Sequence, residues 1–118
     1  MIATSYPAYY SQRKNMLGRL TKELSSQMAG FAQLHKSAVS EGALSVKVKE
    51  LIALAIAVSA RCEGCIAFHT HDAIRAGASR QEILEALGVA ILMGGGPSAM
   101  YACEALEALE QFQAVKTG

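Results

Sequence analysis

Apolar residues form stripes along most of this chain at the three-to-four-residue spacing of a helix face. We find no run in which β-branched and polar residues alternate, as they do in a half-buried strand. Alanine, leucine, glutamate, glutamine and methionine, which all favour helices, are common throughout. The sequence therefore predicts an all-α fold, a single-domain helical bundle of about five to six helices over residues 1–118.

Turn and cap residues divide the pattern into segments. Ser45 is a good N-cap, Gly77 ends a helix, and Ser79 with Glu82 makes a capping box, which is the most secure helix start. Pro97, after three glycines, suits the first position of a last helix. After an irregular start around Pro7, we expect helices over about 9–25, 27–39, 45–60 and 62–76, one starting after 79 and one starting at 97.

The segment 51–60 is apolar on nearly all sides, so we expect it to lie buried at the centre. The whole chain is 52% apolar and only 18% charged, against roughly 25% charged in typical domains. A domain of this size has too much surface to hide all its apolar residues alone. Composition therefore predicts a homo-oligomer, without giving the number of subunits.

The charge pattern excludes some partners. The net charge is +1, and lysine and arginine are scattered, so nucleic acid is not an expected partner. The longest apolar stretch, 51–60, is half as long as a membrane span, and the amino terminus lacks a basic segment followed by an apolar one. We expect a cytoplasmic protein that does not enter the membrane. Three cysteines are too few for a secreted disulfide framework.

Cys62-Glu63-Gly64-Cys65, followed by His69, is the part of the sequence that indicates chemistry. On a helix, positions 62, 65 and 69 lie within roughly 60° of one another, so two thiols and an imidazole share a face. Two cysteines at this spacing can close a disulfide, and His69 can take or return a proton of Cys65. In a reducing compartment such a pair is more often catalytic or metal-binding than structural.

Glu50 lies twelve residues before Cys62, at the head of the apolar helix. A corner at Arg61 would bring it back towards His69, where its carboxylate would fix the imidazole tautomer. The alternative is an exposed carboxylate in the first turn of its helix, favoured by the helix dipole.

A wider set of residues resembles the carboxymuconolactone decarboxylase superfamily, and more narrowly its alkylhydroperoxidase D-like branch, over about residues 45–110. The resemblance implies an all-helical bundle that assembles into trimers or hexamers and a thiol-dependent reduction of hydroperoxides. The residues that carry it are Glu50, Cys62-x-x-Cys65-x-x-x-His69, Leu-Ile-Ala-Leu-Ala at 51–55, Ala73-x-x-x-Gly77 and Ser79-x-x-Glu82-Ile83.

By this resemblance Cys65 attacks the peroxide, Cys62 resolves the product, and His69 with Glu50 forms the proton relay. No cofactor and no metal is implied, and an external dithiol supplies the electrons. The order of the thiols stays open, because Cys62 sits at a helix N-terminus, which stabilises a thiolate. Some relatives carry a histidine where this chain has Gly64, so a relay through that imidazole would be weakened here.

The remaining candidates have simpler interpretations. His71 lies opposite Cys62 on the helical wheel and is expected to be a structural or interface residue. His35, on another helix, is expected to be a partly exposed surface residue. Cys103 is expected to be a small core residue, and the methionines to be packing material.

Three other functions remain open. Cys62, Cys65 and His69 could bind zinc, although a structural site needs a fourth ligand. A lactone decarboxylase of the same superfamily would not depend on the cysteine pair, and a non-catalytic oligomeric redox adaptor would use the pair only to accept electrons. The sequence favours a cofactor-free dithiol peroxidase or disulfide reductase, and it does not reveal the physiological peroxide or electron donor.

Overall fold

Six α-helices make up the computed structural model, which describes residues 5–117 and the side chains of residues 5–115. No strand occurs within residues 5–117, so the all-α prediction is confirmed. The helices are α1 (Tyr6–Glu23), α2 (Ser25–Val39), α3 (Val46–Ser59), α4 (Glu63–Arg75), α5 (Arg80–Gly94) and α6 (Gly96–Thr117).

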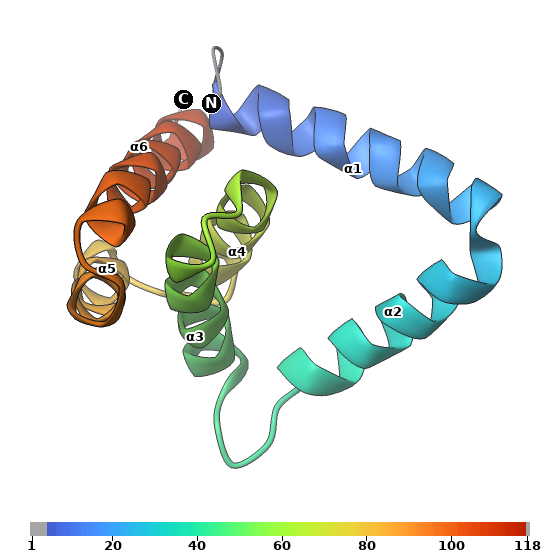
Figure 1. Ribbon diagram of the computed structural model, residues 1–118, viewed down its shortest axis with the longest axis horizontal. Helices are drawn as coiled ribbons and strands as arrows, with labels where there is room; N and C mark the ends of the chain where they lie inside the picture. Colours follow the sequence, from blue (N-terminus) through green and yellow to red (C-terminus); the bar gives the residue numbers. More distant parts are fainter. Residues whose placement is uncertain (1–4, 118) are drawn as a thin grey trace.

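The helices α3 to α6 pack together and form what we call the body (Figure 1). Alanines line much of the buried surface, and their small side chains let the helices approach closely. The largest apolar side chains that are fully buried in the body come from all four helices: Leu54 and Val58 of α3, Ile66 of α4, Ile83 of α5 and Leu109 of α6.

The helices α1 and α2 form an arm that leaves the body, bends at Leu24 and returns to α3 (Figure 1). The first turn of α1 is anchored on α6, where the Tyr6 hydroxyl donates to Glu104 over 2.6 Å and its backbone N–H donates to Gln111 over 2.6 Å. None of the described side chains of α2 is buried. The arm is therefore held at its two ends, with most of its length uncovered.

The irregular start expected around Pro7 is wrong, because α1 begins at Tyr6. Ser5 is its N-cap and accepts the backbone N–H of Ala8 over 3.2 Å. Pro7 lies in the first turn, where its missing N–H would have no helical partner anyway. Pro7 is thus part of a helix start and not of an irregular segment.

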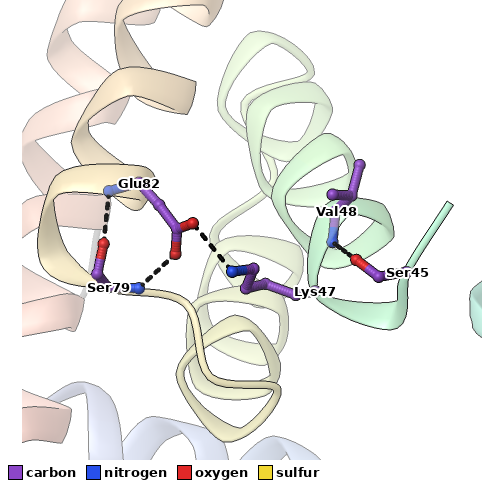
Figure 2. A network of polar contacts seen from close by, with 5 residues as sticks. All are labelled: Ser45, Lys47, Val48, Ser79 and Glu82. Atoms are coloured by element: carbon purple, nitrogen blue, oxygen red, sulfur yellow. Dashed lines mark hydrogen bonds and ion pairs between the residues drawn. The ribbon is translucent and has the colours of Figure 1, made fainter.

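The predicted caps of α3 and α5 are confirmed, and Figure 2 shows how they are linked. Ser45 accepts the N–H of Val48 over 3.1 Å, and Ser79 and Glu82 form the capping box. Lys47 of α3 also donates to the Glu82 carboxylate over 2.9 Å. The pKa of Glu82 is lowered, first by the backbone N–H of Ser79 and then by Lys47.

Some residues expected in the interior lie on the surface. On α3, Leu54 and Val58 are buried, but Ile56 on the opposite side is 62% exposed. Cys103 is exposed as well, so the core position expected for it is wrong. Three of the methionines expected to be packing material are exposed: Met16, Met93 and Met100.

No helix in the described part of the chain is both long and apolar enough to cross a membrane.

Candidate redox site

A tight corner joins α3 to α4 and brings the two halves of the predicted site together. Arg61 has a φ of 58°, in the left-handed region that turns the chain sharply. The N–H of Cys62 then donates to the carbonyl of Ala57, 3.1 Å away. The chain leaves α3 and enters α4 almost at once, so α4 packs back along α3.

Cys62 and Cys65 are joined in a disulfide at the start of α4, with their Cα atoms 5.2 Å apart. Cys62 is the N-cap of the helix, and its sulfur accepts the N–H of Cys65 over 3.1 Å. Cys62 is half-buried, whereas Cys65 is exposed. A helix N-terminus stabilises negative charge on a sulfur, and the exposed sulfur is the one that an outside molecule can reach.

Glu50 is buried, with 3% of its surface exposed, so the alternative of a solvated first-turn carboxylate is wrong. Its Oε1 lies 2.7 Å from Nδ1 of His69. A carboxylate only accepts, so the imidazole donates through Nδ1 and its Nε2 is left for other partners. His69 lies one helical turn beyond Cys65, on the same side of α4.

Asp72 also belongs to this group, although it was not among the residues predicted from the sequence. Its carboxylate oxygen and the ligand-type atoms of Glu50 and His69 all lie within 4.8 Å of one another. These three side chains, rather than the cysteines with His69, are the group that could hold a cation within the described residues. A signal for Asp72 was present, since position 72 follows His69 by three residues and shares its helix face.

His71 packs against the arm. Its ring stacks on that of Tyr10, with centroids 4.2 Å apart, and its Nδ1 lies 2.9 Å from Asp72. The pKa of Tyr10 is raised, mainly by burial and further by Asp72, while Arg75 opposes the shift. The expected structural role of His71 agrees with these contacts.

Two side chains of the arm reach the site, and sequence analysis assigned neither to it. The His35 ring of α2 lies 6.2 Å from the His69 ring, centroid to centroid, with 27° between the ring planes. A Cβ added at Gly64, between the cysteines, would lie 3.8 Å from the Tyr9 hydroxyl. Both depend on the path of the arm, for which the local sequence has no signal.

A cavity of about 280 Å³ opens next to His71 rather than next to the disulfide. It lies between α4 and α6, and none of the predicted catalytic residues lines it. Its walls are His71, Ile74, Arg75, Phe112 and Val115.

The chain is similar to known proteins over most of its length. An uncharacterized protein of Cupriavidus necator is 39% identical over 105 residues, which are 89% of this chain and 93% of that protein. The apo crystal structure of a carboxymuconolactone decarboxylase family protein from Legionella pneumophila superposes with a TM-score of 0.87. It is 47% identical, and the match covers 91% of this chain and 96% of that one.

A family protein from Thermotoga maritima, for which an involvement in an antioxidative response has been suggested, superposes with a TM-score of 0.85. It is 28% identical over 92% of this chain and 93% of that one. The family model for carboxymuconolactone decarboxylases matches residues 27–108, which is more than half of the sequence. This chain therefore belongs to the carboxymuconolactone decarboxylase family.

Proposed function

We propose that this chain is a thiol-dependent peroxidase that reduces organic hydroperoxides. The observation that carries the proposal is the disulfide at the start of α4, with an exposed Cys65 one turn before a His69 that a buried carboxylate holds. The antioxidative involvement suggested for the Thermotoga maritima relative agrees with such an activity.

The reaction needs two thiols and no cofactor. A thiolate attacks the terminal oxygen of the hydroperoxide, so that an S–O bond forms, the O–O bond breaks, and the alcohol leaves. The second thiol attacks the resulting sulfenic acid, and water leaves as the disulfide forms. An external dithiol then reduces the disulfide and is itself oxidised. We place this cycle in the cytoplasm, where such donors keep thiols reduced.

We assign the attack to Cys65 and the resolving step to Cys62. Cys65 is the exposed residue of the pair, whereas Cys62 is half-buried. A Cys62→Ser variant should therefore give a sulfenic acid on Cys65 that dimedone traps in one equivalent, measured by peptide mass spectrometry. A Cys65→Ser variant should react much more slowly, and the reverse result would exchange the two roles.

Glu50 and His69 serve as the proton relay in this proposal. Glu50 holds Nδ1 of His69, which leaves Nε2 to take the thiol proton. Both Glu50→Gln and His69→Gln should slow oxidation by about 10²-fold or more. His71→Gln, on the same helix but packed on Tyr10, is the matched control and should react like the wild type.

The decisive experiment is a count of free thiols by mass spectrometry before and after one equivalent of an organic hydroperoxide. We expect the Cys62–Cys65 link to form within one chain and Cys103 to stay free. Oxidation that produced mainly Cys103 links between chains would remove the redox assignment. Thiols that stayed reduced would instead favour the lactone decarboxylase or the redox adaptor.

We also propose that the protein works as a homo-oligomer, a trimer or a hexamer. Exposed apolar residues on the arm and on the body support this, among them Phe31 at 60% and Leu34 at 63% exposed. Copies of the chain that cover these surfaces would also exclude water near the disulfide. Light scattering at micromolar concentration tests the assembly, and a mass near 12.5 kDa with full activity would contradict it.

A further inference from the structure

His35 is the one histidine that the arm brings to the candidate site. Its ring lies 6.2 Å from that of His69 and is tilted by only 27° from it. The residue is exposed, and the described part of α2 has no buried side chain. The position of His35 is thus not explained by packing in a core.

The two rings are close enough to act on one small molecule. Their centroids lie 6.2 Å apart, so a hydroperoxide that contacts His69 also lies near His35. Because Glu50 occupies Nδ1 of His69, Nε2 is the nitrogen of that ring that remains for the thiol proton.

Cleavage of a hydroperoxide requires two proton transfers at different atoms. The attacking thiol must lose a proton, and the departing alkoxide, which is a strong base, must gain one. The half-buried His69, held by a buried carboxylate, suits the first transfer. His35 is exposed and in contact with water, from which it can recover a proton, so it suits the second.

We propose that His35 is a catalytic residue that protonates the leaving oxygen of the hydroperoxide. In this step a Cys65–oxygen bond forms, the O–O bond breaks, the electron pair goes to the leaving oxygen, and His35 supplies its proton. His69 then releases to water the proton that it took from the Cys65 thiol, and His35 takes up one proton from water, so these two transfers balance. The water that leaves in the resolving step carries the sulfenic hydroxyl and the proton of the Cys62 thiol. This proposal rests on the peroxidase function proposed above.

The test compares two oxidants that differ in their leaving group. With tert-butyl hydroperoxide the leaving group is an alkoxide, which needs a proton, whereas with peracetic acid it is acetate, which does not. Single-turnover oxidation of the pre-reduced full chain is followed by the loss of free thiols. His35→Gln should slow the reaction with tert-butyl hydroperoxide by about 10²-fold and leave the reaction with peracetic acid nearly unchanged.

Two further measurements separate a proton donor from a structural residue. Gln33→Ala, at an exposed position of the same helix, should match the wild type with both oxidants. His35→Ala should recover part of its lost rate with tert-butyl hydroperoxide when imidazole is added to the buffer.

Equal loss with both oxidants, or no loss with either, would overturn the role of His35. Failure of the peroxidase function itself would look different, because the wild-type chain would then leave tert-butyl hydroperoxide unreacted before any variant is made.

Discussion

The body and the arm both carry large apolar side chains on their helices, and the two regions differ in how far these side chains are buried. In the body, Leu54 and Leu109 are fully buried. In the arm, Phe31 and Leu34 are 60% and 63% exposed. Helix-forming sequence and apolar side chains thus make helices in both regions, but only in the body do those helices cover one another. We expect a surface outside this chain to cover the apolar residues of the arm.

The candidate site lies where the two regions meet. The disulfide, Glu50 and His69 belong to α3 and α4 of the body, and they are ordered by the tight corner at Arg61. His35 comes from the arm, on a helix without buried side chains. The body therefore positions the disulfide and the Glu50–His69 pair, whereas the arm places His35 beside them.

The largest expected difference is in the stability of the folded chain. Leu54→Ala should lower the free energy of unfolding by about 2–5 kcal/mol, because it leaves a cavity among fully buried side chains. Leu34→Ala should change it by less than about 0.5 kcal/mol at protein concentrations where the chain is monomeric. Urea unfolding followed by circular dichroism measures both.

Equal losses for the two variants in dilute protein would contradict the contrast between body and arm. If the loss in the free energy of unfolding for Leu34→Ala grew with protein concentration, the contrast between body and arm would be sharper, because only assembled chains would then bury that side chain.

The second prediction concerns the assembly. Phe31→Ser removes an apolar ring that we expect a second copy to cover, which is a loss of about 1.5–3 kcal/mol for each covered side chain. The dissociation constant should rise about tenfold or more, as measured by analytical ultracentrifugation. Gln33→Ser, at an exposed position two residues away on α2, is the control and should leave the mass unchanged. An unchanged mass for both variants would show that the arm does not contribute to the subunit interface.

The third prediction concerns the joint between the arm and the body. Tyr6→Phe deletes the hydrogen bond to Glu104 and should lower the free energy of unfolding by about 1 kcal/mol. The pKa of Tyr6 is raised, mainly by burial and then by the bond to Glu104. The folded state thus prefers the neutral phenol, so its contribution is complete below a pH of about 10 and is lost as the pH rises further.

Alkaline unfolding of the two proteins measures this loss. The wild type should lose stability above a pH of about 10 more steeply than Tyr6→Phe. Parallel curves would show that Tyr6 does not titrate on unfolding.

The sequence could predict what depends on neighbours along the chain. The capping box at Ser79, the cap at Ser45 and the stop at Gly77 are local signals, and all three agree with the structure. The same reasoning misplaced the start of α1, because Pro7 suits a first turn as well as a break. It also placed Ile56 in the interior, because the sequence alone does not show whether the residues that cover an apolar side chain belong to the same chain.

The candidate site likewise contains residues that the sequence could predict and residues that it could not. The helical spacing of Cys62, Cys65 and His69 placed them on one face, and the corner at Arg61 made the contact with Glu50 foreseeable. His35 could not be found, because its position depends on the direction in which α2 returns to the body. That direction is set by the bend at Leu24 and by contacts far apart in the sequence, not by a local motif.

The smallest expected effect concerns the helix starts. The body helix α5 has a capping box whose Glu82 also pairs with Lys47 (Figure 2), whereas the N-cap residue of α2, Leu24, makes no side-chain cap hydrogen bond. Because the pKa of Glu82 is lowered in the folded chain, its carboxylate stabilises the fold above its ordinary pKa of about 4.3, and this contribution is lost as the pH falls through the lowered value.

Glu82→Gln should therefore lower the urea midpoint slightly at neutral pH, and the gap from wild type should close as the pH falls below about 4. Glu85→Gln, which changes a second carboxylate on the exposed side of α5, is the matched control, because Glu85 contacts only Gln81 of its own helix in the described structure. A gap that stayed constant down to the lowest pH would mean that Glu82 acts by its shape and not by its charge. The charged cap would then no longer distinguish the body from the arm.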